Sequence, residues 1–257
     1  VYGDIEKPEV LRRALAFIRA AYAKDKLRGQ TYGLIGGRSM GMYTAIAEQR
    51  VWMEKFGVDV EHIDQLVLVE EAKKIPEEEV NRFLNWLKEN VGKIEFDGER
   101  LTEEKLKMQI RFYLATKKVI KDYQLDFIGI KCQPELAELY VPPCLCPAFI
   151  NDPYDADGKK EPVVMACEVD MDAALTMQIL KLISGKPILF FDFRHYDPKE
   201  GVYVFCNCGS QSTWYAARSD DPKENLKKVW LVPQAFYFKR GGAAVQYVAA
   251  PGEVTLA

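Results

Sequence analysis

Apolar and polar positions alternate along this chain with two different periods. Apolar residues recur at helical spacing in long segments, which predicts amphipathic helices at 8–23, 77–90 and 103–122. Short apolar runs that end in glycine or polar residues predict strands at 31–35, 58–63 and 125–132. Because strands and helices alternate, the pattern indicates an α/β fold with a doubly wound, mostly parallel sheet.

A further helix and a long loop are expected within this region. Ser39, after the break at Gly36-Gly37, is suited to cap a helix that runs from Met40 towards Phe56. A loop rich in proline and cysteine spans residues 133–153. It is too long for a passive connection in a compact domain, and such loops are usually functional or disordered.

The stretch 162–195 has the pattern of a strand, a helix and a second strand. Its first apolar run ends at Glu168, an amphipathic segment covers 170–183, and the second run carries Asp192 in its middle. A right-handed crossover places two such strands side by side or nearly so, which lets the carboxylates converge. Burying a carboxylate is costly unless a cation or donors satisfy it. We expect a divalent metal between Glu168 and Asp192; the alternative is an ion pair of Asp192 with Arg194.

The pattern changes after Gly185. Short strands with turn signals between them are predicted at 186–195, 201–208, 228–232 and 244–249. We predict a domain boundary near residue 186, with an α/β domain over 1–186 and the first part of a mainly β domain over 187–257. The chain begins with Val1 and ends in V-T-L-A, as if within a strand, which suggests a fragment.

Composition narrows the class of partner. Apolar residues make up 48% of the chain and charged residues 28%, which is typical of a globular protein and excludes a disordered one. The net charge is −3, and basic and acidic residues are interspersed. The sequence therefore has no excess of clustered basic residues, as a nucleic-acid-binding protein would have, and a small-molecule partner is expected. No apolar run reaches the ~18 residues that span a bilayer, and no signal-peptide pattern is present. We therefore expect a cytoplasmic protein without a membrane partner.

Candidate binding residues follow from the geometry of an open parallel sheet, where ligands bind outside the carboxyl ends of the strands. That rule selects the turn Gly36-Gly37-Arg38-Ser39-Met40-Gly41, the pair Cys132-Gln133, and Glu168. Backbone N–H groups of the turn would suit an anion or a hydroxylated ligand; a tight turn with nothing bound is the alternative. The glycine spacing fits neither a dinucleotide fingerprint nor a Walker motif.

Two cysteine pairs, Cys144-x-Cys146 and Cys206-x-Cys208, raise the alternative of a zinc site. Cysteine pairs that bind zinc normally have more than one residue between them. With only one intervening residue, the two side chains lie close together for binding to one tetrahedral ion. Ser210 follows a predicted strand in the turn N-C-G-S and could present its hydroxyl to a site. No Ser-His-Asp order stands out.

The chain resembles the L-fucose isomerase family, which includes D-arabinose isomerases that act on configurationally similar sugars. The matching segments are G-G-R-S-M-G at 36–41, Gln133 after a strand, C-E-V-D at 167–170, F-D-F-R at 191–194 and N-C-G-S at 207–210. The resemblance covers nearly all of the chain. Its specific part is the Glu168/Asp192 pair with the helix between them.

The resemblance implies a metal site and a sugar site. In that family the residues matching Glu168 and Asp192 bind Mn²⁺ and serve as acid/base groups, while those matching Gln133 and Ser210 lie near the sugar. The candidate residues are thus, for metal and catalysis, Glu168 and Asp192 and, for the sugar, Gln133, Ser210, Met40 and Arg38.

The resemblance also implies parts that this chain lacks. The family has a further α/β domain before the position of Val1, which helps to close a neighbouring subunit's site in the assembled oligomer. Its third metal ligand, a histidine, lies far beyond the position of Ala257. A homo-oligomer, either a trimer or a hexamer, is therefore expected for the complete protein.

The implied reaction interconverts an aldose and a ketose, which makes the protein a Mn-dependent ketol isomerase. A proton moves between adjacent carbons through an ene-diol, whose negative charge a metal held by carboxylates would stabilise. Glu168 is the expected base and Asp192 its partner. Two alternatives remain: a non-catalytic sugar-binding or regulatory module on the same fold, and a zinc-dependent hydrolase that uses the cysteine pairs.

Overall fold

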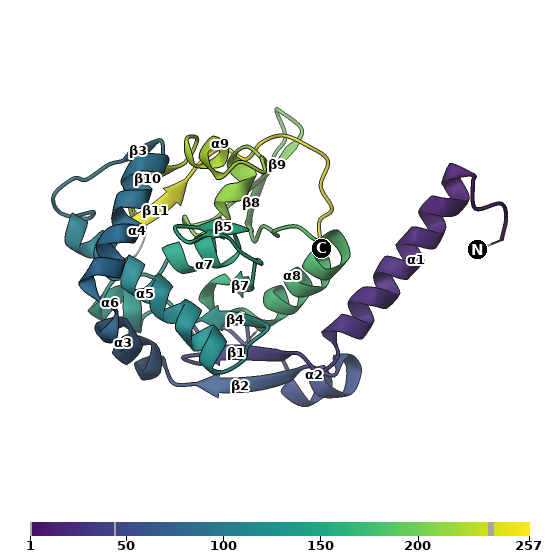
Figure 1. Ribbon diagram of the computed structural model, residues 1–257, viewed down its shortest axis with the longest axis horizontal. Coiled ribbons are helices and arrows are strands. Elements are labelled where there is room, and N and C mark those ends of the chain that lie inside the picture. Colours follow the sequence, from purple (N-terminus) through teal and green to yellow (C-terminus); the bar gives the residue numbers. More distant parts are fainter. Residues whose placement is uncertain (1, 44, 236–238) are drawn as a thin grey trace.

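The computed structural model describes residues 2–43, 45–235 and 239–257. A parallel sheet with the strand order β2-β1-β4-β7 organises the fold (Figure 1). Its strands are β1 (Thr31–Ile35), β2 (Asp59–Ile63), β4 (Phe127–Ile130) and β7 (Val164–Ala166). Strands are added on both sides of β1, as in a doubly wound sheet. The predicted α/β fold with a mostly parallel sheet is therefore confirmed.

Each strand contributes to two cores, one on each face of the sheet, because successive side chains of a strand point in opposite directions. Tyr32 and Leu34 of β1 pack with Trp52 on one face. Ile35 packs into the core of the other face. Helices α2 (Gln49–Phe56) and α8 (Met171–Ser184) cover the first face, and α3 (Gln65–Lys74) and α5 (Glu103–Asp122) cover the second.

The long helices form where the apolar period predicts them. Helices α1 (Pro8–Leu27), α4 (Glu77–Asn90) and α5 match the predicted segments. Thr102 caps α5 by accepting a hydrogen bond from the N–H of Lys105 at 3.3 Å. Helix α3, which begins after its cap residue Asp64, was not predicted.

The glycine-rich turn does not start a helix. In the described part of segment 36–48 the chain forms turns and bends, so the predicted start of a helix at Met40 is wrong, whereas α2 confirms the second part of that helix and its end at Phe56. The reason is positive φ, which a right-handed helix does not contain. The residues concerned are Gly36 (93°), Gly37 (77°), Met40 (49°) and Gly41 (70°). The next helix, α2, is capped by the side chain of Glu48 instead of by Ser39.

Residues 133–153 contain two short helices, so the expectation of one long loop is wrong. They are α6 (Glu135–Leu139) and α7 (Leu145–Ile150). Every residue of α7 is buried, and the ring of Phe149 lies 5.7 Å from that of Phe83 and 5.9 Å from that of Tyr113. Burial of apolar surface therefore orders this proline- and cysteine-rich segment.

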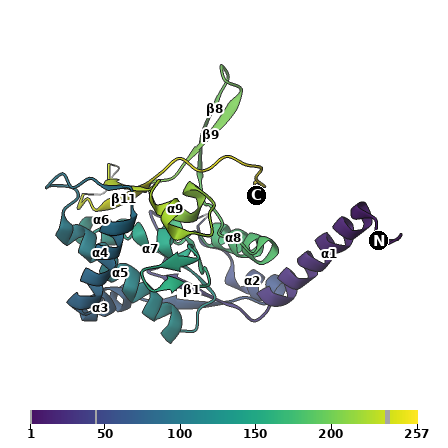
Figure 2. The same cartoon turned by 45° about the horizontal axis from the view of Figure 1, so that its top comes forward.

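The residues after α8 contribute to further small sheets, and the strands predicted at 201–208, 228–232 and 244–249 are confirmed. Strands β8 (Asp192–Asp197) and β9 (Val202–Cys206) form a hairpin that projects from the body (Figure 2). Strand β10 (Trp230–Pro233) pairs with β11 (Ala243–Gln246) and with β3 (Lys93–Ile94). Because β3 precedes residue 186, the two predicted domains share this sheet, and the boundary between them stays a prediction. The remaining elements are β5 (Tyr154–Asp155), β6 (Gly158–Lys159), a 3₁₀ turn at Thr213–Ala216 and α9 (Pro222–Leu226).

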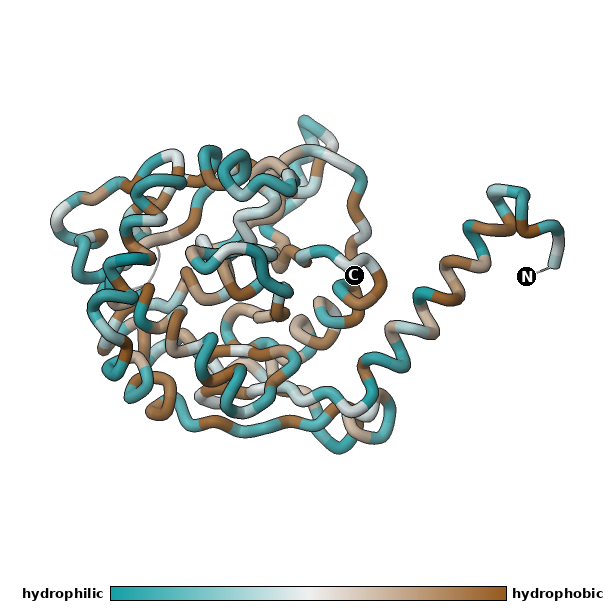
Figure 3. The backbone as a smooth tube through the Cα atoms, viewed as in Figure 1, coloured by the Kyte–Doolittle hydropathy of each residue, from teal (hydrophilic) through white to brown (hydrophobic). Residues whose placement is uncertain are grey.

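Helix α1 extends away from the body (Figures 1 and 2). Hydrophobic and hydrophilic positions alternate along it (Figure 3), yet Phe17 is 73% exposed and Ile18 58%. Its buried residues, Ala23 and Leu27, lie at its C-terminal end. Among the described helices, none is both long enough and apolar enough to cross a membrane.

Candidate functional site at the carboxyl edge of the sheet

Glu168 lies on a strained turn directly after β7. The 3₁₀ turn Cys167–Val169 places Glu168 at φ 58° and Val169 at φ 60°, a region that side chains with a Cβ rarely adopt. Gly129 of β4 makes room for this turn, because a Cβ there would lie 2.7 Å from Val169 Cα. Asp170 then caps α8 by accepting a hydrogen bond from the N–H of Ala173 at 3.0 Å. Strand, strained turn and capped helix together fix the direction of the Glu168 side chain.

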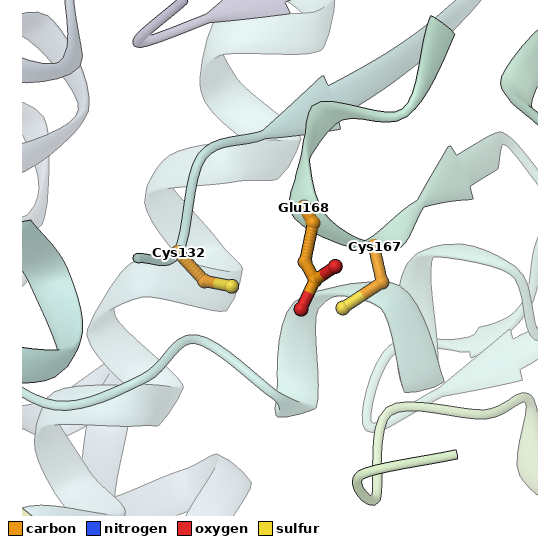
Figure 4. Close-up of side chains that lie close together, drawn as sticks. All are labelled: Cys132, Cys167 and Glu168. Carbon is orange, nitrogen blue, oxygen red and sulfur yellow. The ribbon is translucent and has the colours of Figure 1, made fainter. Parts of the chain in front are cut away.

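The Glu168 carboxyl group faces sulfur atoms. Figure 4 shows it between the side chains of Cys132 and Cys167. The two Sγ atoms and a carboxylate oxygen all lie within 4.8 Å of one another. Burial, together with the negative charges of Cys208 and Asp192, raises the pKa of Glu168 to about 7. A carboxyl group with this pKa exchanges its proton readily near neutral pH.

Asp192 is the first residue of β8 and is exposed. The prediction that it lies in the middle of a buried strand beside β7 is wrong, since β8 pairs with β9 outside the main sheet. The segment before it is held by Gln211, whose side chain accepts a hydrogen bond from the N–H of Phe190 at 2.8 Å and donates to the Phe190 carbonyl. Partial burial and the charge of Cys208 raise the pKa of Asp192, while Arg194 lowers it.

The two predicted carboxylates share one electrostatic environment, because the charge of Asp192 contributes to the raised pKa of Glu168. A cation between them would relieve that repulsion, and carboxylate oxygens are donors that Mn²⁺ accepts. The carboxylate oxygens of Glu168 and Asp192 are thus of the donor type that suits a divalent metal, although Asp192 does not belong to the group of possible ligand atoms within 4.8 Å of one another around Glu168. The nearby thiols of Cys132 and Cys167 are softer donors, which suit Zn²⁺ better than Mn²⁺.

The glycine-rich turn meets Gln133 at the same edge of the sheet. The hydroxyl of buried Ser39 donates to the backbone carbonyl of Gln133 at 3.2 Å. Arg38 is exposed, with its guanidinium group 4.3 Å from the centre of the Tyr43 ring. Met40 is 47% exposed. Arg38, Met40 and Gln133 thus belong to one edge, although Arg38 stacks on Tyr43.

Ser210 has a structural partner within its own turn. It is buried, and its hydroxyl donates to the Asn207 side chain at 2.9 Å. The same Asn207 oxygen accepts the N–H groups of Gly209 at 3.0 Å and of Ser210 at 2.8 Å. The turn holds Cys208, whose pKa is lowered by hydrogen bonds from the thiols of Cys144 and Cys167.

The cysteines gather in a way that the sequence pairs did not indicate. One member of each C-x-C pair, Cys144 and Cys208, joins Cys132, Cys167 and Glu168 around one cavity. The other members are elsewhere: Cys146 accepts a hydrogen bond from Thr116 at 3.6 Å, and Cys206 lies in the hairpin. The only sign of the cluster in the sequence was that Cys132 and Cys167 each follow a predicted strand. The structure shows that these two strands, β4 and β7, are neighbours in the sheet.

Comparisons with known proteins show similarity to sugar isomerases. A family model described as "L-fucose isomerase, C-terminal domain" matches residues 205–257. The L-fucose isomerase of Haemophilus influenzae is 24% identical over 97% of this chain, and that of Streptococcus pneumoniae 27% over 78%. A sulfoquinovose isomerase of a Clostridium species is 25% identical over 82%.

The chain spans about half the length of the curated relatives it matches, or less. It covers 52% of the Haemophilus enzyme, 44% of the Clostridium enzyme and 38% of the Streptococcus enzyme. Relatives at this level extend over most of the chain, which includes the Glu168 turn and the Asp192 hairpin. The chain is therefore similar to the L-fucose isomerase family of sugar isomerases, as its motifs predict.

Proposed function

We propose that this chain carries the acid/base and metal-binding residues of an aldose–ketose isomerase that acts on sugars like L-fucose and D-arabinose. The observation that carries the proposal is the half-buried Glu168 carboxyl group, which a strained turn holds at the carboxyl edge of the sheet and whose pKa is raised to about 7. Relatives named as L-fucose isomerase and sulfoquinovose isomerase support the reaction class.

In the proposed reaction Glu168 moves the proton. A carboxylate oxygen of Glu168 accepts the proton from the carbon next to the sugar aldehyde and returns it to the former aldehyde carbon. The hydroxyl proton of the first carbon passes to the former aldehyde oxygen, with Asp192 as the partner acid/base group, and the two transfers together convert the aldose into the ketose. Its strained turn limits the directions that the side chain can take. A divalent cation such as Mn²⁺, held by Glu168 and Asp192, would supply positive charge for the sugar oxygens on which negative charge develops.

Substrate contacts are proposed at the edge of the sheet. Gln133 and the exposed Met40 would contact the sugar, and Arg38 would turn from Tyr43 towards it; the position of Gln133 beside Ser39 and the exposure of Met40 support this assignment. The role of Ser210 is to hold the turn that carries Cys208, in addition to any contact with the sugar. We extend the proposal to a cytoplasmic homo-oligomer, trimeric or hexameric, whose size light scattering on the complete protein would measure.

The test uses the complete protein that contains this chain. With Mn²⁺ we expect it to convert L-fucose or D-arabinose into the ketose, with sulfoquinovose as a third substrate to compare. Glu168→Gln keeps the size of the side chain but removes its proton transfer, so kcat should fall by about 10²-fold or more. The matched control is Glu89→Gln, an exposed position on α4, which should keep full activity.

Two outcomes would contradict the proposal. Full activity of Glu168→Gln would remove Glu168 from the reaction. Sugar binding in calorimetry without any turnover by the unchanged protein would favour the non-catalytic module. A chelator-treated sample that regains activity with Mn²⁺ would support the proposed metal.

A further inference from the structure

Four cysteines from distant parts of the chain meet beside Glu168. Cys132 follows β4, Cys167 follows β7, Cys144 precedes α7, and Cys208 lies in the turn after β9. Together they line a cavity of about 10 Å³, which has room for one water-sized sphere. Glu168 also lines the cavity, and the remaining lining residues are apolar, namely Ile130, Pro143, Pro147 and Met165.

Three of the polar groups have nearly the spacing of metal ligands. The Sγ atoms of Cys132 and Cys167 and a carboxylate oxygen of Glu168 lie within 4.8 Å of one another, and Figure 4 shows the three side chains directed towards one space. In a tetrahedral zinc site with Zn–S bonds of about 2.3 Å, neighbouring ligand atoms are about 3.8 Å apart. An inward movement of about 1 Å by these side chains is enough to bind an ion.

Cys208 is the natural fourth donor. It lines the same cavity as Cys132, Cys144, Cys167 and Glu168. The Asn207 side chain fixes the turn on which Cys208 sits, as described above. A single buried thiol is ordinary core packing, but a row of thiols beside a half-buried carboxyl group and a cavity is a set of ligands.

We propose that Cys132, Cys167 and Glu168 bind a thiophilic divalent cation such as Zn²⁺, with Cys208 as the fourth ligand. Thiolates prefer Zn²⁺ to harder ions such as Mn²⁺ or Mg²⁺. Each thiol that coordinates the ion releases its proton to the solvent. This site takes Cys208 from one of the cysteine pairs and its other ligands from the ends of two parallel strands.

Occupation of this site has a consequence for catalysis. An ion held by the cysteine thiolates would draw the Glu168 carboxylate towards Cys132 and Cys167 and away from Asp192 and the sugar, so Zn²⁺ would inhibit isomerisation even with Mn²⁺ present. This consequence rests on the proposed function. The binding of the thiophilic ion does not, because it requires no turnover.

The test measures Co²⁺ binding to this chain after reduction and removal of metal with a chelator. Thiolate coordination gives Co²⁺ a strong charge-transfer absorption in the near ultraviolet, which oxygen ligands alone do not produce. We expect one equivalent of Co²⁺ to bind with this absorption, and Zn²⁺ to displace it. Cys132→Ser and Cys167→Ser should each weaken binding at least about tenfold.

Control variants separate this site from its neighbours. Cys146→Ser alters an equally buried cysteine that contacts Thr116 outside the cluster, and it should leave the absorption unchanged. Asp192→Asn should also leave it unchanged, because Asp192 is not among the ligands. Circular dichroism verifies the folding of each variant, and Glu168→Gln provides a second way to weaken binding if a serine variant does not fold.

Three results would overturn the proposal. One is an unchanged protein that gives no charge-transfer absorption with Co²⁺. Another is binding that is lost in Asp192→Asn and kept in both serine variants, which would place the ion at the carboxylate pair and leave the proposed function intact. The third is the loss of two free thiols in air without cobalt binding, which would identify the cluster as a disulfide-forming pair.

Discussion

Glu168 and Asp192 are both affected by the negative charge of Cys208, although they differ in burial. Glu168 is partly buried at the end of a core strand, whereas Asp192 is exposed at the start of a projecting hairpin. Burial raises the pKa of both, and the negative charge of Cys208 adds to the effect on each. The charge of Asp192 also contributes to the raised pKa of Glu168, so a variant at Asp192 alters the protonation of Glu168.

The coupling predicts the outcome of a double-mutant cycle in the complete protein. Asp192→Asn removes one charge of the pair, so kcat should fall about 10²-fold, as for Glu168→Gln. The kcat of the double variant should be only a little lower than that of the slower single variant. When two residues act as a unit, the first substitution already removes their shared contribution to catalysis. The measurement is kcat at saturating sugar and Mn²⁺, with Asp220→Asn at an exposed position as the control. Additive losses would mean that the two carboxylates act independently.

At the scale of elements, the junction between β7 and α8 holds the candidate base in place. The positive φ angles of Glu168 and Val169 cost free energy, which neighbouring contacts must offset. The Asp170 cap is one such contact, and the close approach of Gly129 to Val169 is another. The hydroxyl of Tyr32 adds a third by donating to the carbonyl of Val169 at 3.4 Å.

The cap makes a prediction about stability. Asp170→Ala removes the acceptor for the N–H of Ala173, so the free energy of unfolding should fall by about 1 kcal/mol. Asp170→Asn keeps an oxygen at the same position and should stay within a few tenths of a kcal/mol of the unchanged protein. Urea unfolding of this chain measures both values. Equal losses in the two variants would assign the effect to the charge of Asp170 instead of its cap.

Most elements were predictable because their signals are local. The runs T-Y-G-L-I and F-I-G-I are buried on both faces, so their apolar character alone marked strands. Helices α4 and α5 were marked by apolar period and acidic first turns. The alternation of predicted strands and helices indicated the α/β fold. The same fold placed Gln133 and Glu168 at the carboxyl edge of the sheet.

The errors come from contacts between residues far apart in sequence. The chain before Asp192 reads as a strand, but its Phe190 pairs with the side chain of Gln211 instead of a neighbouring strand. Ser39 reads as a cap, but the positive φ of Met40 and Gly41 directs its hydroxyl to Gln133. The cysteine cluster likewise draws one residue from each of four separate segments. Such tertiary contacts leave no periodic pattern in the sequence.

At the scale of the whole molecule, a buried carboxyl group ties the segment after α7 to the segment after β9. Asp152 is fully buried and accepts hydrogen bonds from the hydroxyls of Ser212 and Thr213 and from the N–H of Trp214 at 3.1 Å. Half-buried Lys160 lies nearby and donates to the Asp152 backbone carbonyl. These bonds cross the predicted boundary near residue 186, as the β3–β10 pairing does.

The carboxyl group of Asp152 makes stability depend on pH. Burial raises its pKa from 3.8 to about 6, although the hydrogen bonds from Ser212, Thr213 and Trp214 oppose the change. A raised pKa in the folded state means that the protonated form is favoured there. The contribution to stability is thus complete below about pH 4 and is lost as the pH rises through about 6. The shift corresponds to a free energy on the order of 3 kcal/mol.

Asp152→Asn isolates this contribution, because the amide cannot ionise and keeps one oxygen acceptor for Ser212 and Trp214. Thr213 can adapt, since its hydroxyl also shares a hydrogen bond with Tyr154 at 2.8 Å in which either group can donate. Lys160, whose pKa burial lowers to about 8, stays protonated between pH 4 and 6 and so contributes equally to both proteins there. We expect the free energy of unfolding of the variant, relative to the unchanged chain, to rise between pH 4 and 6 by up to about 3 kcal/mol. Urea unfolding at several pH values measures it, with exposed Asp220→Asn as the control. Parallel curves for the two proteins would show that Asp152 does not ionise in this range, and that its hydrogen bonds hold its pKa near the ordinary value despite burial.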